Sequence, residues 1–341
     1  MSVIRRWSAG LFFLLLSACS TLPPEGRNPP PERKDPERYS GLRTKSDLPV
    51  LEAPDIPALA PRWYPLSTGG GLSILAGKIK KGRLEFWVIK IDLDCTLENR
   101  PSEVSEGEGE NLNLRIVLGA GKGGLPRPGY VLSTRVSSFV MDRGLLAGIN
   151  AVPFDPSSAR EGEERRLAGI AITGGKTIAP PVSRYDALVF YEGGGAAIVN
   201  QGELDAERAE EQKPRIAHAV GGFHQILRDG ELTDRALKKA AGPRYARSAA
   251  GLSTGGRILY LMVINGGLPG KPGATETETA LILKRLGARD VLNLDGGGSS
   301  AMAFRFSGGE VKTLNTPVHF FPGWERAVAL CLGIGLESYA K

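Results

Sequence analysis

The sequence predicts an α+β fold: mostly antiparallel or mixed β-sheet with a few packed helices, in a single globular domain over residues 66–341. Two patterns carry this prediction. Short apolar runs rich in β-branched residues alternate with Gly-rich or Asp-Gly turns, which is typical of β-hairpins. Only one stretch has the spacing of a clear amphipathic helix. Hydrophobic residues make up 41% of the 341 residues, which is enough for a packed core.

The first 19 residues have the order of an export signal: two arginines, an apolar run and then small residues. The stretch LSAC at 16–19 resembles the bacterial lipobox, which implies that Cys19 is acylated and anchors the protein to a membrane. The alternative is an ordinary cleaved signal with a chance cysteine. We expect an exported lipoprotein at the periplasm or cell surface. Ser20, rather than Asp, after the cysteine suits the outer membrane of a cell that has two membranes.

Residues 20–65 are predicted to form a disordered tether. The run PPEGRNPPPERKDPERYS is proline-rich and charged, and few of its residues can pack. Such a segment does not offset its ordering entropy, so it stays extended. It would hold the folded domain away from the membrane.

The net charge of +6 and the scattered cysteines and histidines narrow the function classes. No basic stripe with interleaved aromatics appears, so we expect no nucleic-acid partner. Cys95 and Cys331 lie in strand-like runs and could either pair or stay buried and free. No metal motif is present and no cofactor is predicted, although oxygen ligands near an anion could hold Ca²⁺ or Mg²⁺.

The strands are expected in a series along the chain. The segments that carry strand or strand–turn–strand patterns are 71–94, 113–121, 145–150, 166–178, 186–204, 223–232, 247–267 and 325–336. A short helical pattern precedes the strand at 145–150. The motif GLSTG at 251–255 matches a hydrolase nucleophile pattern, but a strand follows it where that chemistry needs a helix. We therefore interpret it as a hairpin turn.

The clear helix is predicted over 276–286. Thr275 and Glu278 have the spacing of a capping box, in which each side chain accepts a hydrogen bond from an otherwise unpaired backbone N–H. Gly287 is the expected stop. The cap alone explains Glu278, so a structural role and a site role both stay open.

The stretch NLDGGGSS is the strongest candidate site. Asp295 ends an apolar strand, and Gly296, Gly297 and Gly298 would expose consecutive N–H groups as a nest for an anion. Ser299 and Ser300 add hydroxyl groups. No lysine and no helix follow, which excludes a phosphate-binding loop and a dinucleotide fingerprint. A plain turn is the alternative.

Several stretches in the same order resemble the phosphodiester glycosidase family, which includes bacterial members described as exopolysaccharide-related. The most specific is LGARDVLNLDGGGSSAM; the others are AGINAVPF, RSAAGLSTGGRILYLMVINGG, TETETALILKRLG and NTPVHFFPGWERAVAL. The resemblance covers about residues 70 to 338. It implies hydrolysis of a sugar-1-phosphodiester, with release of free sugar and a phosphomonoester.

The resemblance also implies roles for individual residues. Asp295 is the first choice for the carboxylate that activates water or stabilises positive charge at the anomeric carbon, and Glu278 is the second. Arg247 and Arg326 would grip the phosphate, together with the glycine nest. Asn150 would contact sugar hydroxyls or water. Asn315 is also placed at the substrate. The expected partner is a phosphorylated glycan.

Two departures from the family pattern bear on activity. Ala151-Val152-Pro153 stands where glycines and an aromatic are usual, and Asn265 stands where an Asp is usual. Loss of that carboxylate could alter the substrate, slow the reaction or leave a binding protein. The rival hypothesis is therefore a non-catalytic envelope lipoprotein that binds a phosphorylated glycan or exopolysaccharide.

Overall fold

The protein was analysed as a computed structural model that describes residues 41–66, 71–95, 113–123, 125–157, 160–204 and 215–337. All of these lie within one compact unit, Pro36–Lys341. The predicted signal peptide, its Cys19 and the first half of the predicted tether lie outside the described residues.

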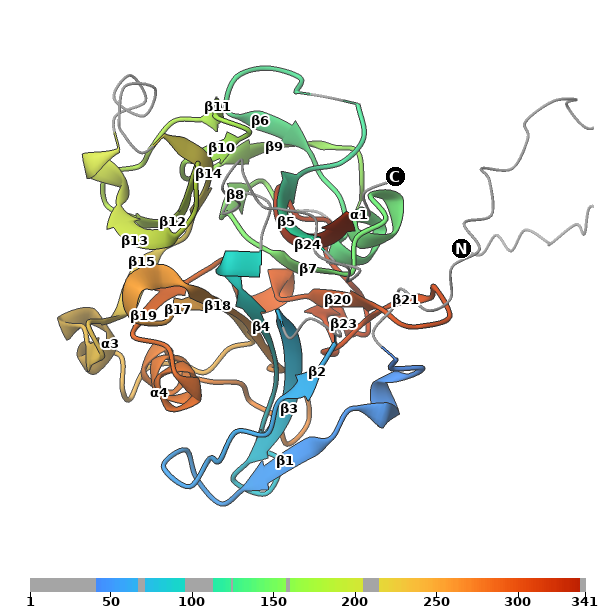
Figure 1. The fold of residues 1–341 in the computed structure, drawn as a ribbon, viewed down its shortest axis with the longest axis vertical. Helices are drawn as coiled ribbons and strands as arrows, with labels where there is room; N and C mark the ends of the chain where they lie inside the picture. The colour runs from blue at the N-terminus through green and yellow to red at the C-terminus, as the bar shows by residue number, and fades with distance from the viewer. Residues whose placement is uncertain are drawn as a thin grey trace, which may run out of the picture. The chain divides into compact units, whose positions relative to one another are not determined.

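A nine-stranded sheet forms the centre of this unit (Figure 1). Its strand order is β1-β3-β4-β18-β17-β19-β15-β16, with β2 on β3. The strands are β1 (Val50–Ala53), β2 (Tyr64–Pro65), β3 (Leu72–Ile79), β4 (Leu84–Asp92), β15 (His224–Arg228), β16 (Glu231–Leu232), β17 (Arg247–Leu252), β18 (Ile258–Ile264) and β19 (Asp290–Asn293). All pairs are antiparallel except β1 with β3.

Four smaller sheets complete the described β-structure. Two have five strands, in the orders β11-β10-β14-β12-β13 and β21-β20-β7-β24-β5; one has three, β6-β9-β8, and one has two, β22-β23. The strands are β5 (Asn113–Gly119), β6 (Tyr130–Leu132), β7 (Ala147–Asn150), β8 (Phe154–Asp155), β9 (Glu164–Leu167), β10 (Ala171–Thr173), β11 (Lys176–Ala179), β12 (Asp186–Tyr191), β13 (Ala196–Asn200), β14 (Ile216–Gly221), β20 (Met302–Arg305), β21 (Val311–Thr313), β22 (Val318–His319), β23 (Phe321–Pro322) and β24 (Cys331–Glu337).

Helices are few and short. The α-helices are α1 (Val136–Asp142), α3 (Asp234–Lys238) and α4 (Glu276–Leu286), and the single-turn 3-10 helices are η2 (Lys45–Asp47), η3 (Leu93–Cys95), η5 (Gln201–Glu203), η6 (Thr254–Gly256) and η7 (Gly297–Ser299). The α+β prediction, with mainly antiparallel sheet, is thus confirmed for the described residues.

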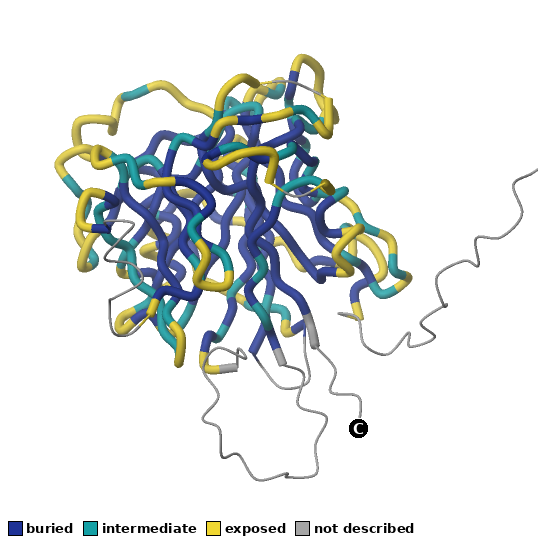
Figure 2. The backbone as a smooth tube through the Cα atoms, turned by 90° about the horizontal axis from the view of Figure 1, so that it is seen from above, coloured by how far each residue is buried: buried dark blue, intermediate teal, exposed yellow. Residues whose placement is uncertain are grey.

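Two large hydrophobic cores lie on opposite faces of the central sheet. One face packs against the smaller sheets, through residues such as Leu292 and Leu294 of the central sheet and Ile149 of β7. The other face packs against α4, through Leu283 and its neighbours. The buried chain fills the interior, and exposed segments lie at the periphery (Figure 2). This division into two faces decides which predicted site residues can meet, because neighbouring residues of a strand point to opposite faces.

The tether prediction was wrong for its second half. Residues 41–66 contain η2, β1 and β2, and three of their leucines, Leu42, Leu48 and Leu59, are only 0–3% exposed. Apolar residues spaced between the prolines can pack against the central sheet, and β1 pairs with β3. The folded part therefore begins well before residue 66.

The local predictions were confirmed where turns and caps are explicit. The pattern at 71–94 forms the β3–β4 hairpin and that at 247–267 forms β17–β18, with the GLSTG motif at the turn. Helix α4 begins after Thr275 and has the predicted capping box, and Gly287 ends it at φ 113°. Cys331 is a buried free cysteine, and the side chain of Cys95 lies outside the description.

Candidate active site

The glycine run joins the central sheet to β20 at a point where three chain segments meet. After β19, the Asp295 N–H donates to the Ala151 carbonyl at 3.1 Å, and the Gly297 N–H donates to the Ala246 carbonyl at 2.8 Å. Gly297 has φ 60°, a left-handed conformation that glycine adopts without a Cβ clash. The run is therefore clamped from both sides by backbone hydrogen bonds.

Asp295 belongs to a cluster with Ser299, Arg326 and His319. The Arg326 guanidinium donates through Nη1 to Ser299 Oγ and through Nε to His319 Nδ1, each at 3.1 Å. Ser299 also hydrogen-bonds to the Asp295 carboxylate. A Cβ atom at Gly298 would lie only 2.5 Å from the same guanidinium, so only glycine allows Arg326 to lie against the run. These residues are the chemical centre of the candidate site.

The surroundings of Asp295 favour its protonated form more than water does. Burial raises the pKa of Asp295 from 3.8 to about 6, although Ser299, the Arg326 charge and the Gly296 N–H oppose the rise. A carboxyl group with a pKa near the operating pH is suited to accept or donate a proton. Among the predicted site residues, Asp295 is the one carboxylate with this property.

His319 is a neutral partner of Arg326. Burial, and then the Arg326 charge, lower the pKa of His319. Its Nδ1 accepts a hydrogen bond, so the ring proton is on Nε2, and this atom is buried without a partner among the described residues. His319 thus orients the guanidinium without adding charge.

Asn150 and Asn315, both predicted to lie at the substrate, have their side-chain amides bonded inside the protein. Asn150 is fully buried; its amide donates to the Asp295 carbonyl at 2.6 Å and accepts from Ser248 Oγ and the Ala301 N–H. Asn315, also buried, donates to the Ser300 carbonyl and accepts from the Met302 N–H. Both amides are buried, and each one donates to and accepts from the protein itself. They fix the backbone on either side of the glycine run.

Arg247 points to the opposite face of the central sheet from its neighbour Ser248, which bonds to Asn150. Its guanidinium donates to the Ala274 carbonyl at 3.0 Å and to the Pro243 carbonyl at 3.5 Å, and it lies 3.9 Å from Glu276. It makes no hydrogen bond or ion pair with Asp295 in the described part of the chain. The expected pairing of Arg247 with Arg326 around one phosphate is therefore not what the described residues show.

Glu278 is held in a structural role. Its carboxylate accepts from Lys80 at 2.8 Å, from both ends of the Arg244 guanidinium and from the Thr275 N–H. Burial would raise the pKa of Glu278, but the hydrogen bonds from Arg244 and Lys80 outweigh it and lower the pKa. A carboxylate bound by two cations is a poor base, and its contacts lie at the start of α4 rather than beside Asp295.

The donor nest predicted from three glycines is smaller in the structure. The Gly296 N–H donates to Asp295 Oδ1 and the Gly297 N–H to Ala246, so both are occupied. The Gly298 N–H makes no hydrogen bond with the residues that the structure describes. Ser300 Oγ is likewise buried and unpaired within that part of the chain. One backbone donor, rather than three, is left for an anion.

The two departures from the family pattern are explained by packing. Asn265 donates to Glu85 Oε2 at 2.7 Å and accepts from the Thr316 N–H at 2.8 Å, a pair of bonds that an ionised Asp cannot make because it has no donor. Residues 151–153 are buried, and the Ala151 carbonyl accepts the Asp295 N–H. Neither departure removes a side chain from the Asp295 cluster.

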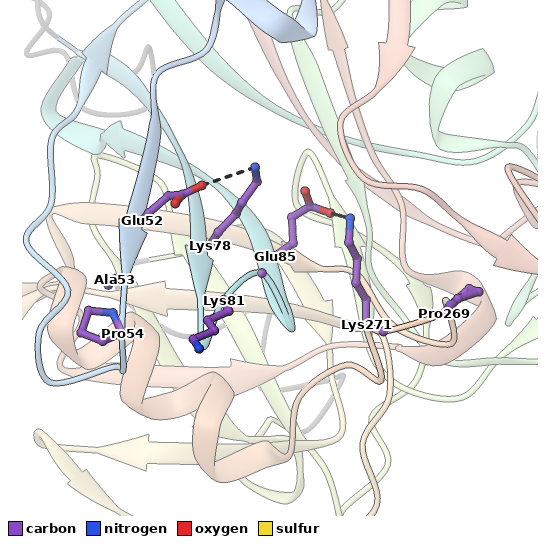
Figure 3. Close-up of a pocket in the computed structure, with 10 residues that line it drawn as sticks. Glu52, Ala53, Pro54, Lys78, Lys81, Glu85, Pro269 and Lys271 are labelled. Carbon is purple, nitrogen blue, oxygen red and sulfur yellow. Dashed lines mark hydrogen bonds and ion pairs between the residues drawn. The ribbon is translucent and has the colours of Figure 1, made fainter.

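A large hollow of about 830 Å³ lies elsewhere, at the end of the β3–β4 hairpin (Figure 3). Four of its charged lining residues form ion pairs, Lys78 with Glu52 and Lys271 with Glu85. None of the predicted site residues lines it. We therefore centre the candidate site on Asp295 and not on this hollow.

Comparison with known proteins gives the family. The family described as Phosphodiester glycosidase matches residues 143–335, more than half of the chain. The chain belongs to the phosphodiester glycosidase family. The resemblance stated from the sequence is thus confirmed, and the matched residues include the whole Asp295 cluster. A search of curated protein sequences found no match.

One solved structure supports the fold, and two others are more distantly similar. The chain is similar to the catalytic domain of zebrafish N-acetylglucosamine-1-phosphodiester alpha-N-acetylglucosaminidase, auto-inhibited by its pro-peptide: the TM-score is 0.55 at 18% identity, over 79% of this chain and 85% of that one. A hypothetical protein from Synechocystis has a TM-score of 0.49 at 13% identity, over 82% and 65% of the two chains. A putative exported protein from Burkholderia pseudomallei has 0.46 at 15%, over 74% of each.

Two buried residues of this phosphodiester glycosidase family member, His319 and Glu276, were not predicted from the sequence. His319 matches no histidine motif, but it lies between the two family positions Asn315 and Arg326. Glu276, 9% exposed, lies 3.5 Å from Arg235, with Oε2 buried and without a hydrogen bond among the described residues. Its signal was the alternation TETET, in which one glutamate caps the helix and the other turns inward.

The described residues also bear on metal binding and on membrane crossing. No three His, Cys, Asp or Glu side chains in them gather closely enough to hold a metal ion, so the Ca²⁺ or Mg²⁺ suggestion has no cluster there. None of the described helices has the length and apolar character needed to cross a membrane.

Proposed function

We propose that this protein is an envelope-anchored lipoprotein that hydrolyses a sugar-1-phosphodiester linkage in a glycan. The products are the free sugar and a phosphomonoester. Membership of the phosphodiester glycosidase family supports the reaction class. The observation that carries the proposal is Asp295: a carboxylate with a raised pKa, joined through Ser299 to Arg326, at the family's glycine signature.

The reaction needs one base and one source of positive charge. Water attacks the anomeric carbon and gives its proton to Asp295, while the bond from that carbon to the phosphate oxygen breaks and the electron pair leaves with the phosphate. A phosphate departs as a stable anion, so it has less need of the acid that protonates the leaving group in ordinary glycosidases. Arg326 and the free Gly298 N–H would neutralise the charge on the departing phosphate.

The binding-protein alternative keeps one supporting observation. Glu278 is bound by two cations at the start of α4, away from Asp295, so Asp295 is the one carboxylate of the cluster. The Asn265 departure, however, no longer favours this alternative, because its amide is bonded to Glu85 and Thr316. We therefore place hydrolysis first.

The test is turnover of the methyl phosphodiester of N-acetylglucosamine-1-phosphate, measured as released sugar. Asp295→Asn keeps the shape of the side chain and removes the base, so we expect the rate to fall by about 10²- to 10⁴-fold. Asp142→Asn is the control, because Asp142 lies outside the Asp295 cluster and forms an ion pair with the exposed Lys122. Wild-type turnover by Asp295→Asn would refute the mechanism. Binding of the diester by the wild type without turnover would establish the binding protein.

A further inference from the structure

A hairpin beside the candidate site exposes three aromatic side chains. Phe320, Phe321 and Trp324 are 74%, 61% and 55% exposed. The rings of Phe321 and Trp324 meet edge to face at 5.5 Å, so they form a cluster rather than scattered side chains. Single exposed apolar residues need no explanation, but a clustered aromatic patch usually marks a surface that binds something.

The hairpin holds these rings in fixed positions. The His319 N–H donates to the Trp324 carbonyl at 3.0 Å, and the Trp324 N–H donates to the Phe321 carbonyl at 3.1 Å. Phe320 has φ 68°, a left-handed conformation that is unfavourable for a bulky residue, and its ring lies 4.1 Å from the His319 ring. Strained residues of this kind persist where the surrounding structure determines them, and they concentrate at functional sites.

The same hairpin borders the Asp295 cluster. His319, between Val318 and Phe320, accepts the hydrogen bond from Arg326. The Val318 carbonyl lies against Gly298, 3.2 Å from where a Cβ would be. The aromatic patch is therefore continuous with the site through one residue, His319.

We propose that Phe320, Phe321 and Trp324 form a stacking surface for sugar rings that lie beyond the cleaved linkage. The substrate is then an oligosaccharide or polysaccharide chain and not a small phosphodiester. This inference rests on the proposed function. A sugar ring has an apolar face of C–H groups and a hydroxyl rim, and the electron-rich face of an aromatic ring attracts such weakly positive hydrogens. A rigid aromatic platform beside a hydrolytic site suits the next sugars of a chain.

A membrane surface is a poorer match for this patch. Membrane-binding surfaces combine apolar side chains with Lys and Arg that contact anionic lipids. The segment PVHFFPGW at 317–324 contains no Lys and no Arg. Its one titratable side chain, His319, has a lowered pKa because of burial and of Arg326. The rings therefore lie on an uncharged loop, which suits the uncharged sugar rings of a glycan.

The test compares two probes that carry the same reacting group. One is the methyl phosphodiester of N-acetylglucosamine-1-phosphate; in the other, the phosphate joins this sugar to an oligosaccharide of five hexoses. We expect Phe321→Ala and Trp324→Ala each to raise KM for the oligosaccharide about 2- to 10-fold, with kcat unchanged, because one aromatic contact contributes on that scale. Values for the methyl diester should not move, and Trp324→Phe should restore most of the affinity.

Leu237→Ala is the matched control, since Leu237 is 54% exposed on α3. It should leave both probes unaffected. Equal KM values of the wild type for the two probes would overturn the inference while the proposed function stands. No turnover of either probe, together with binding of the oligosaccharide that Trp324→Ala weakens in calorimetry, would overturn the function and keep the inference. Loss of binding to phosphatidylglycerol vesicles by the ring variants, with unchanged oligosaccharide KM, would assign the patch to a membrane and overturn it.

Discussion

Asp295 combines two demands on one side chain: it must be partly sheltered from water and still lose its proton near neutral pH. Burial raises its pKa to about 6, against the pull of Ser299 and Arg326. If the ionised form is the base, activity should rise with pH along a limb whose midpoint is near 6. The measurement is kcat/KM for the methyl diester from pH 4.5 to 8. A flat profile across this range would exclude Asp295 as the base.

The same group makes a prediction for stability. Its pKa is raised on folding, from 3.8 to about 6, so the folded state holds its proton more tightly. Its contribution to stability is therefore full below about pH 4 and is lost as the pH rises through 6. Asp295→Asn should remove this loss, worth at most about 3 kcal/mol because one pKa unit corresponds to about 1.4 kcal/mol. Melting temperatures should show the variant gaining on the wild type between pH 4 and pH 7.5; a constant difference would contradict the cause given for the shift.

At the scale of single residues, the sequence could identify Asp295, Ser299 and Arg326 but not the direction of every side chain. Asn150 and Asn315 carry amide groups of the kind that bind ligands, yet these amides donate to backbone carbonyls of the protein itself. Arg247 lies one residue from Ser248, and the strand sends the two to opposite faces. These outcomes depend on how distant strands pair, which no local pattern contains.

At the scale of elements, the start of α4 combines a local capping signal with contacts to residues far away in the sequence. Thr275 and Glu278 form the capping box that the sequence predicts. Glu278 then also binds Lys80, from the turn after β3, and Arg244. The cap could be predicted because its partners are three residues apart, whereas the two cations come from other elements.

Glu278→Gln tests whether that glutamate is structural. We expect a loss of about 1–2 kcal/mol in unfolding free energy at pH 7, the scale of hydrogen bonds to charged groups at a partly exposed site. Folding lowers the pKa of Glu278 from its usual value of 4.5, so its stabilisation is present above that pH and fades as the pH falls below it. Urea unfolding at pH 7 and at pH 3 measures both. Because Glu278 is not the base, kcat should stay within about 3-fold of wild type; a loss as large as that of Asp295→Asn would give Glu278 a catalytic role.

The hairpins could likewise be predicted from the sequence, whereas the order of the strands in the sheet could not. The β3–β4 and β17–β18 hairpins follow from strands joined by short turns. The order that places β18 beside β4, and β19 between β17 and β15, joins segments far apart in the chain. Such pairings are decided by the burial of whole faces, and a single sequence does not specify them.

At the scale of the whole molecule, the proposed membrane attachment depends on the N-terminal segment. The proposal rests on the LSAC stretch at 16–19 and the charged, proline-rich run after it. In a bacterial host, fractionation should find the wild type with the membranes and Cys19→Ala released from them. Acyl chains contribute roughly 0.8 kcal/mol per buried CH₂, so their loss should change the distribution strongly. Equal membrane retention of both proteins would refute the lipid anchor.

The bond that joins Asn265 to Glu85 restricts the order in which this sequence can change. The family's usual Asp at position 265 would place a second carboxylate 2.7 Å from Glu85 and lose the donated hydrogen bond. We expect Asn265→Asp alone to lower the melting temperature, and Glu85→Gln to recover most of the loss when combined with it. Thermal unfolding of the two single variants and the double variant measures this coupling; additive losses would show that the two sites are independent. If they are coupled, Asn265 is contingent on Glu85. A variant that carries an aspartate at 265 is then expected to be stable only if Glu85 is changed as well, so the two positions should be engineered together.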